Sequence, residues 1–445
     1  MNLLIVHQNF PGQYRHLAAA LVARGDRVVA IGGPTAQPLQ GVTLHRYDPR
    51  PAAGVPPCHS WVGDMQTKVL RAEAVAVQVE ALRKQGLKLD LVIGHPGWGE
   101  LLAIKEVLPG VPVLHHLEFF YQLEGADVGF DPEFSQASWR SQARLRLRRA
   151  PQLLALEDLD WGLAPTHWQA STAPLVYRDR ISVIHEGVDT AQAAPRQGAE
   201  LHLEKAGLTL RPGDEVVSFV ARNLEPYRGI HCFLRMLPLL QRLRPQARVV
   251  IVGEEGVSYG APPPGGGSWK RALLQELSGQ LDLSRIHFVG RVPHPLLHEL
   301  FRICACHVYL TYPFVLSWSL LEAMACAAVV IGSATAPVQE VIESERNGLL
   351  VDFFDLEAMA HTIAAVLADP PRFRPLGQAA RQTVVERYDL ATICLPAQLE
   401  LVDGLAAGRR PSGLSVARDS SGNGSVDDSI GSLAGATRIN PSTSH

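Results

Sequence analysis

Two arginines and one glutamate lie in a pattern suited to binding a diphosphate. Arg222 and Arg228 are six positions apart and closely follow Val216–Val220, an apolar run expected to form a strand. Farther along, Ser317–Ala325 is expected to run from a loop into a helix that carries Glu322. One guanidinium group can bind two phosphate oxygens at once. A helix N-terminus adds backbone N–H groups that have no partner within the helix. Because a nearby carboxylate accepts hydrogen bonds from ribose hydroxyls, the pattern predicts a sugar-nucleotide site.

Length and composition indicate a soluble protein with more than one domain. The chain has 445 residues, of which 47% are hydrophobic and 19% charged. This length and composition are ordinary for a soluble enzyme with hydrophobic cores. The formal net charge of −3 gives no general attraction for nucleic acid, so no nucleic-acid partner is expected. The six cysteines are interpreted as reduced thiols. No apolar run reaches the roughly 18 residues of a membrane span, and a cytoplasmic protein is expected.

Short apolar runs alternate with longer helical patterns, which is typical of parallel α/β architecture. The expected strands of a first series are Leu3–Val6, Val28–Ile31, Leu91–Gly94 and Val113–His115. Those of a second series are Val216–Val220, Val249–Val252, Ile286–Val289, Val308–Leu310 and Val329–Ile331. The pattern breaks between Asp189 and Arg211, so we expect one domain over residues 1–195 and another over 205–375.

The end of the chain carries two further expectations. Residues 380–402 are expected to include a helix that returns to the first domain. Residues 408–445 are rich in Ser, Gly and Asp and poor in apolar groups, so we expect a disordered tail there. Upstream of both, Asp355 is expected to cap a helix that buries Met359, Ile363 and Val366.

Five motifs of the C-terminal half occur in the order found in one known family. They are Arg222 and Arg228 with Gly229, Gly290-Arg291-Val292, Leu320–Ala325, Glu340-Val341-Ile342 and Asn347–Val351. As a set they resemble the nucleotide-binding half of a retaining family-4 glycosyltransferase with the GT-B fold. The resemblance covers nearly all of residues 210–370.

The N-terminal half resembles a bacterial subgroup of the same family. The matching segments are His7–His16, which contains HQNFPGQ, and Gly94–Glu100, Gly125–Asp131 and His185–Asp189. The corresponding C-terminal stretch of this subgroup is YPFVLSWSLLEAMA, at Tyr312–Ala325.

The resemblance implies a fold and an activity. It implies two doubly wound, Rossmann-like domains facing a cleft, with the donor in the C-terminal domain and the acceptor mostly in the N-terminal domain. The implied reaction moves a sugar, with retention, from a nucleoside-diphosphate sugar to a hydroxyl of a glycan or lipid-linked acceptor, in bacterial surface polysaccharide synthesis and without a cofactor. Two alternatives stay open: a sugar-nucleotide epimerase or related enzyme on this fold, and a catalytically silent protein that binds nucleotide sugar or glycan.

One position departs from the family pattern. The family has Glu-x7-Glu, in which the second glutamate matches Glu322 and the first falls on Phe314. In the family the first glutamate commonly contacts the donor sugar, so the identity of the sugar does not follow from relatives. Phe314 is also the feature that favours a silent binding protein.

The resemblance implies roles for individual residues. Arg222 and Arg228 would neutralise the diphosphate as it leaves, and His95 would contact the donor sugar or phosphate, which makes these three the catalytic candidates. The donor-binding candidates are Gly12, Gly290, Arg291, Val292, Ser317, Trp318, Glu322 and Glu340. Each also has a plain structural interpretation, such as an ordinary turn, a packed tryptophan or a solvated charge.

Two histidines and a carboxylate follow an expected strand of the first series. They are His115, His116 and Glu118, a set of residue types that also binds metals. Adjacent residues of a strand point to opposite faces of the sheet, so no metal site is expected. We interpret the three as candidates for the acceptor side instead.

A basic segment, Trp139–Arg149, carries several arginines between apolar residues. As a helix it could lie on an anionic membrane surface near a lipid-linked acceptor. The alternative is a solvated helix face.

Overall fold

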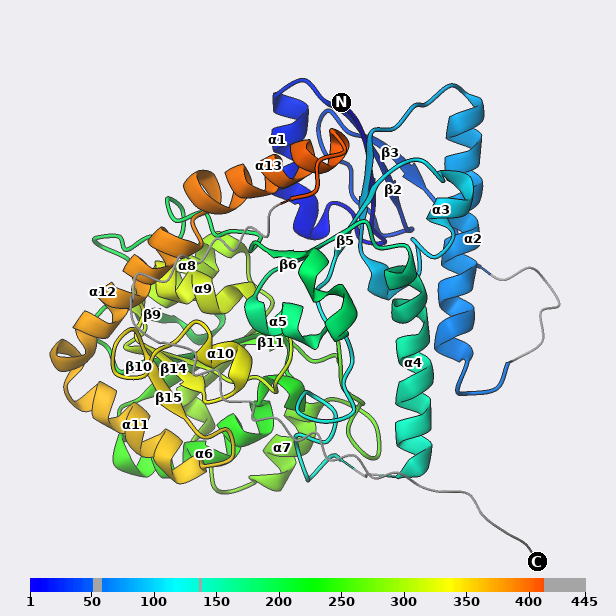
Figure 1. Ribbon diagram of the computed structural model, residues 1–445. Coiled ribbons are helices and arrows are strands. Elements are labelled where there is room, and N and C mark those ends of the chain that lie inside the picture. The colour runs from blue at the N-terminus through cyan, green and yellow to red at the C-terminus, as the bar shows by residue number, and fades with distance from the viewer. Residues whose placement is uncertain (51–57, 136–137, 412–445) are drawn as a thin grey trace, which may run out of the picture.

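Two parallel β-sheets, one in each half of the chain, form the frame of the molecule (Figure 1). This is a computed structural model, and it describes residues 1–50, 58–135 and 138–411. Most of the tail expected at 408–445 lies outside the described residues. Within them, all six cysteines are free.

The N-terminal sheet has seven strands in the order β3-β2-β1-β4-β5-β6-β7, all parallel. The strands are β1 (Asn2–Val6), β2 (Arg27–Gly32), β3 (Thr43–Arg46), β4 (Leu91–Gly94), β5 (Val113–His116), β6 (Trp161–Ala164) and β7 (Ile181–Val183). Leu3–Val6 of the central strand are fully buried because helices cover both faces of a parallel sheet. The strand order reverses between β1 and β4, and in such sheets ligands bind outside the carboxyl ends of the strands at the reversal.

The C-terminal sheet has six parallel strands in the order β12-β11-β10-β13-β14-β15. The strands are β10 (Val216–Asn223), β11 (Arg248–Glu254), β12 (Ile286–Gly290), β13 (Cys306–Tyr309), β14 (Val330–Ser333) and β15 (Leu349–Val351). An antiparallel hairpin of β8 (Leu201–Leu203) and β9 (Leu208–Leu210) precedes this sheet. The two parallel sheets confirm the expected α/β class with two doubly wound, Rossmann-like domains.

The helices of the N-terminal half are α1 (Arg15–Ala23), α2 (Gly63–Lys84), α3 (Ile104–Val107), α4 (Trp139–Glu157) and α5 (His167–Thr172). Those of the C-terminal half are α6 (Ile230–Leu243), α7 (Trp269–Glu276), α8 (His294–Ile303), α9 (Trp318–Ala325), α10 (Ala336–Gln339), α11 (Leu356–Ala368), α12 (Pro370–Arg387) and α13 (Leu395–Ala406). Asp355 caps α11 as expected, since its carboxylate accepts a hydrogen bond from the backbone N–H of Ala358 at 2.8 Å. Among the described helices, none combines the length and apolar character needed to cross a bilayer.

The last two helices belong to different halves of the molecule. Helix α12 packs against α9 of the C-terminal half, whereas α13 contacts α1 and β4 of the N-terminal half (Figure 1). Leu401 and Val402 of α13 are buried in the same apolar cluster as Leu3 and Ile5 of β1. The chain therefore returns to its N-terminal half after α12.

The segment that follows β5, residues 117–135, lies against the C-terminal half and is called the β5 segment below. The carboxylate of Asp131 accepts a hydrogen bond from the hydroxyl of Tyr312 at 2.7 Å and lies 2.9 Å from Nε2 of His231. All three side chains are buried. The hydroxyl of Tyr227 donates to Asp127 at 2.9 Å, which adds a second polar contact between the halves.

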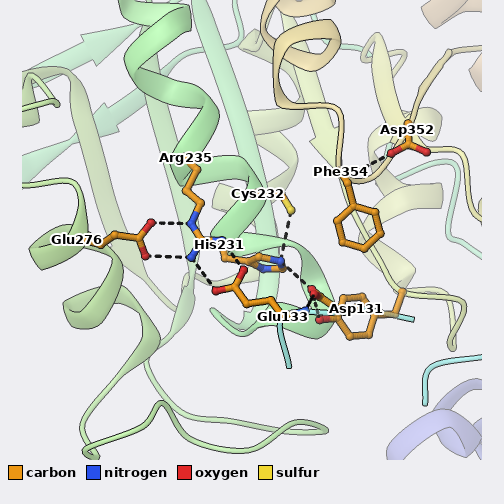
Figure 2. A network of polar contacts seen from close by, with 9 residues as sticks. Asp131, Glu133, His231, Cys232, Arg235, Glu276, Asp352 and Phe354 are labelled. Atoms are coloured by element: carbon orange, nitrogen blue, oxygen red, sulfur yellow. Dashed lines mark hydrogen bonds and ion pairs between the residues drawn. The ribbon is translucent and has the colours of Figure 1, made fainter. Parts of the chain in front are cut away.

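A more exposed ion-pair network lies beside the buried one (Figure 2). Arg235 of α6 binds two carboxylates, with 2.6 Å from Nη1 to Glu133 of the β5 segment and 2.6 Å from Nε to Glu276 of α7. These side chains are a quarter to nearly half exposed, so solvent screens the charges.

We predict that Asp131→Ala lowers the free energy of unfolding by roughly 2–4 kcal/mol, because it leaves Tyr312 and His231 without their buried partner. The matched control is Glu133→Ala, which removes only a screened ion pair and should cost less than about 1 kcal/mol. Urea denaturation of both variants at pH 7 measures the difference. Equal losses in the two variants would contradict the importance of the buried contact.

Candidate functional site

Arg228 is a buried cation in the turn between β10 and α6. Its side chain is 6% exposed, although an arginine is seldom buried without a charged partner. Nη1 donates to Oγ1 of Thr311 at 2.8 Å and to the carbonyl of Val315 at 2.9 Å, and lies 3.5 Å from the hydroxyl of Tyr309. All of these hydrogen bonds within the described residues end on neutral oxygens. The guanidinium group is therefore held in place while its charge stays available to an anion.

Arg222 is placed differently from Arg228. It lies near the end of β10, and its side chain is exposed to solvent. The two cations expected to act together thus lie at the end of β10 and in the turn that follows it, and they differ in burial. A fixed position is shown for Arg228, whereas Arg222 has the freedom of a surface side chain.

The start of α9 lies next to Arg228. The backbone N–H of Ser317 donates to the hydroxyl of Tyr309 at 2.7 Å, and this same hydroxyl contacts Arg228. Trp318 follows with a side chain that is 46% exposed. The N–H of Ser317, which is expected to bind phosphate, therefore lies close to Arg228 but already donates a hydrogen bond to Tyr309.

Glu322 of α9 faces two histidines of the neighbouring helix α8. Its Oε1 lies 3.3 Å from Nδ1 of His294 and 3.9 Å from Nε2 of His298. Burial raises the pKa of Glu322, but the two histidines outweigh this effect and lower the pKa to about 2. The carboxylate is thus ionised and can accept hydrogen bonds. The two histidines were not among the sequence candidates; their spacing of four on one helix was the available signal.

The turn after β12 is open. Gly290 has φ of 69°, and a Cβ added there would meet no atom within 4 Å. Arg291 is exposed, with Nη1 3.9 Å from Glu254, and Val292 is half-buried. This turn leaves room for a flat group beside the main chain.

Glu340 joins the two halves of the protein. Its two carboxylate oxygens accept hydrogen bonds from the backbone N–H groups of His167 and Trp168, each at 2.7 Å. These N–H groups begin α5, where a carboxylate is favourable. The expected contact of Glu340 with a donor would compete with this contact between halves.

In the N-terminal half, histidines and carboxylates gather at the carboxyl ends of β4, β5 and β7. Nε2 of His95 lies 3.2 Å from Oε2 of Glu118, and Nε2 of His116 lies 3.1 Å from Oε1 of Glu186. The rings of His95 and His116 are 6.2 Å apart. The structure thus brings together three of the sequence candidates and adds Glu186, which the matching segment His185–Asp189 contained without singling it out.

His115 does not take part in this cluster. It is fully buried, and neither ring nitrogen has a hydrogen-bond partner among the described residues. Burial lowers the pKa of His115 to about 4, so the ring is neutral. His116 and His115 face opposite sides of β5, as the alternation of a strand requires.

Gly12 packs against the ring of His7, which belongs to the same region. A Cβ on Gly12 would lie 2.8 Å from Cε1 of His7, and Gly12 has φ of 47°, so only glycine fits without displacing the ring. Tyr14 lies edge-on to both His7 and His116, with ring centroids 5.7 Å and 5.8 Å away. Burial lowers the pKa of His7 to about 3, helped by neighbouring His95.

The electrostatics of this region favour hydrogen bonding to hydroxyl groups. Burial raises the pKa of Glu186, but His116 and His185 outweigh it and lower the pKa to about 2. Burial likewise lowers the pKa of His95, despite Glu118. Glu118 and Glu186 are therefore ionised hydrogen-bond acceptors with imidazole rings beside them. A pocket beside them is lined by His95, Glu118 and Phe119, among others.

Phe314 belongs to an aromatic cluster at the boundary between the halves. Its ring centroid lies 4.7 Å from that of Phe119 in the β5 segment and 4.8 Å from that of Tyr259. Tyr259 in turn lies 5.4 Å from the guanidinium carbon of Arg228. The position where the family pattern has a glutamate is thus an apolar wall next to the buried cation.

Glu100, in the turn after β4, is an unusual carboxyl group. It is 1% exposed, accepts a hydrogen bond from the hydroxyl of Tyr47 at 2.6 Å, and its other oxygen has no partner among the described residues. Burial raises the pKa of Glu100 to about 7.

Comparison with known proteins identifies both halves. The profile of the glycosyl transferase family 4 group matches residues 24–193, and that of glycosyl transferases group 1 matches residues 204–383. A D-inositol 3-phosphate glycosyltransferase from Segniliparus rotundus is 25% identical over 364 residues, which cover 78% of this chain and 72% of that protein. An alpha-maltose-1-phosphate synthase from Mycolicibacterium smegmatis is 30% identical over 238 residues, or 50% of this chain and 56% of that protein.

Two solved structures share the fold over nearly the whole chain. Sucrose-phosphate synthase from Thermosynechococcus elongatus superposes with a TM-score of 0.67 and 20% identity, covering 92% of this chain and 100% of that one. Anabaena HepE in complex with UDP and glucose superposes with a TM-score of 0.63 and 17% identity, covering 91% and 100%.

We predict that Glu100 makes the folded state less stable as the pH rises. A folded-state pKa of about 7, above the usual value of about 4.3, means that the native protein binds this proton more tightly than the unfolded chain. The stabilisation is complete below about pH 4 and is lost as the pH rises through 7. Relative to Glu100→Gln, the wild type should lose on the order of 3 kcal/mol between pH 4.5 and 8.

Chemical denaturation at both pH values measures this change. The control is Glu73→Gln on the exposed side of α2, whose effect on stability should be nearly the same at the two pH values. If wild type and Glu100→Gln differ equally at pH 4.5 and 8, the pKa of Glu100 is not raised.

Proposed function

The chain belongs to the glycosyltransferases of the family-4 type with the GT-B fold, and on that premise we propose a specific reaction for it. The enzyme transfers a sugar from a nucleoside-diphosphate sugar to a hydroxyl of a glycan or lipid-linked acceptor, with retention of the anomeric configuration. A role in bacterial surface polysaccharide synthesis, on the cytoplasmic side, fits this reaction.

The observation that carries the proposal is the buried guanidinium of Arg228. A cation at 6% exposure, bonded to neutral oxygens, is prepared for a ligand that brings its own negative charge. As the donor bond breaks, charge grows on the diphosphate, and a fixed cation away from water stabilises it strongly. Arg222, an exposed residue near the end of β10, can fold onto the outer phosphate oxygens.

The donor's nucleoside has matching groups on the same domain. The ionised carboxylate of Glu322 accepts hydrogen bonds from the ribose hydroxyls, and the open turn at Gly290, Arg291 and Val292 takes the base against the main chain. Both lie after strands of the C-terminal sheet, on the side where ligands of such sheets bind. HepE, which shares the fold, was solved in complex with UDP, and this supports a nucleoside diphosphate as a probe for the present chain.

The acceptor side is supplied by the N-terminal half. Glu118, Glu186 and the imidazoles near them can hold sugar hydroxyls, and His95 reaches toward the transferred sugar from the same cluster. We propose that the leaving phosphate itself receives the acceptor proton, so that the protein contributes position and charge stabilisation. Several relatives are named for inositol phosphate or phosphatidylinositol acceptors, which makes inositol phosphates useful first acceptors in an assay.

Contact with a membrane surface would bring the enzyme to a lipid-linked acceptor. Helix α4 begins with Trp139, which is 64% exposed, and carries exposed Leu153 and Leu154 farther along. The arginines of the basic stretch Trp139–Arg149 lie between Trp139 and these two leucines. This arrangement supports peripheral binding to an anionic bilayer.

One observation supports a second candidate function. The aromatic wall at Phe314 replaces a carboxylate that relatives of the family use on the donor sugar, as in a protein that binds nucleotide sugars without transfer. The two functions differ in a simple assay. A silent binding protein shifts its melting temperature with a nucleoside diphosphate but releases no sugar.

We predict that Arg228→Ala lowers kcat by about 10²–10³ because a charge that stabilises the transition state is lost. The donor is first selected by thermal shift against UDP, GDP, ADP, TDP and their sugars, and transfer is followed by release of the nucleoside diphosphate. Arg228→Lys keeps the positive charge and should recover a large part of the rate. Arg242→Ala, an exposed arginine of α6, serves as the matched control and should behave as wild type.

The anomeric configuration of the product, measured by NMR from the proton coupling constant, should equal that of the donor. An inverted product would overturn the proposed retention. Transfer by Arg228→Ala at the wild-type rate would remove the main support for the site.

A further inference from the structure

Two histidines of α8 and one glutamate of α9 bring atoms of the kind that bind metal ions close together. His294 and His298 are four residues apart and therefore lie on the same face of α8. Nδ1 of His294 and Nε2 of His298 both approach Oε1 of Glu322, at 3.3 Å and 3.9 Å. The three ligand atoms all lie within 4.8 Å of one another.

This geometry matches what a small divalent cation requires. Zn²⁺ binds imidazole nitrogens and carboxylate oxygens at about 2.0–2.2 Å, so two ligands at a tetrahedral angle lie roughly 3.3–3.5 Å apart. The separation of His294 and Glu322 already has this value, and a small rotation of the His298 ring closes the remaining distance. Two histidines and one carboxylate leave a fourth position open to water or another ligand.

A second, independent observation comes from His298. The residue is 8% exposed, and its Nε2 has no hydrogen-bond partner within the described part of the chain. Buried polar atoms in proteins nearly always have a partner. This nitrogen points at Glu322, and the exposed ring of His294 leaves the point accessible from solvent.

The other candidate cluster of ligand types does not meet the same conditions. Asp131, Glu133 and His231 also lie close together, but Figure 2 shows that their atoms are already engaged. Asp131 accepts a hydrogen bond from Tyr312 and Glu133 binds Arg235, so a cation would have to break both contacts. The point between α8 and α9 has no such competing partners among the residues that the structure describes.

We propose that His294, His298 and Glu322 bind a divalent transition-metal ion, with Zn²⁺ as the probe of choice, and that the bound ion competes with the nucleotide. The proposed metal site depends only on the positions of these three side chains. The competition rests on the proposed function, in which the carboxylate of Glu322 holds the donor ribose.

One carboxylate cannot serve both ligands fully. When Zn²⁺ is bound to Oε1, Glu322 loses acceptor capacity and negative charge toward the ribose hydroxyls. Linkage makes the effect reciprocal, so a nucleotide weakens Zn²⁺ binding by the same factor by which Zn²⁺ weakens the nucleotide. Zn²⁺ would therefore act as an inhibitor that raises the apparent KM for the donor.

The test is a titration of the metal-free, full-length protein with Zn²⁺ against a chromophoric chelator. The wild type should bind one ion per chain, and His294→Ala and His298→Ala should each weaken that binding by at least about 10-fold, because each removes one of three ligands. The exposed position of His294 makes its variant safe for folding, and circular dichroism checks both.

The matched control is His361→Ala. His361 forms an exposed pair with Glu357 on α11, at 3.9 Å and with the same spacing of four, but it belongs to no three-ligand cluster among the described residues. Its variant should bind Zn²⁺ as the wild type does. If neither His294→Ala nor His298→Ala changes the affinity, or if His361→Ala changes it equally, the site is overturned.

The competition is measured in the same assay with UDP and GDP added at saturating concentration. The nucleoside diphosphate that raises the melting temperature should also weaken Zn²⁺ binding in the wild type. Unchanged Zn²⁺ affinity in its presence would overturn the competition and leave the metal site standing. If no sugar nucleotide supports transfer but both histidine variants still lose Zn²⁺, the metal site is supported and the proposed function fails.

Discussion

The buried carboxylate of Asp131 is the contact on which the arrangement of the two halves depends. It comes from the β5 segment of the N-terminal half and meets Tyr312 and His231 of the C-terminal half, with all three side chains out of solvent. Burial makes each of these polar groups depend on its partner. The N–H groups at the start of α5 also donate hydrogen bonds to Glu340. With the contact of Asp131, these bonds hold the carboxyl ends of the two sheets facing each other.

That arrangement places opposite charges in the two halves. The C-terminal half presents a buried guanidinium with neutral partners, and the N-terminal half presents ionised carboxylates beside histidine rings. A sugar nucleotide has the complementary sequence of groups, with an anionic diphosphate followed by hydroxyl groups. The same logic applies to Glu322, whose environment keeps it ionised and so suited to the ribose contact and to the cation that we propose.

Much of the fold was predictable because local patterns are strong in parallel sheets. Strands such as Leu91–Gly94, buried on both faces, are continuous apolar runs, and the cap at Asp355 follows from its own side chain. The long helix α2 was not predicted, because Ala72, Val75 and Val79 make only a thin apolar stripe among polar residues. In the site, the motifs indicated Arg228, Glu322 and the histidines of β5, but not their partners Tyr309, His298 and Glu186.

The sequence by itself determined the α/β class, the two-domain order and the family to which the chain belongs, since these depend on periodicity and on motifs read along the chain. Only the tertiary structure decided which charges are buried, which candidates meet, and that Glu340 spans both halves while Phe314 joins an aromatic wall. The physical reason is that burial and pairing depend on residues far apart in sequence. Spacing along the chain determines on which face of its own helix or strand a residue lies. It does not determine which other part of the chain packs against that face.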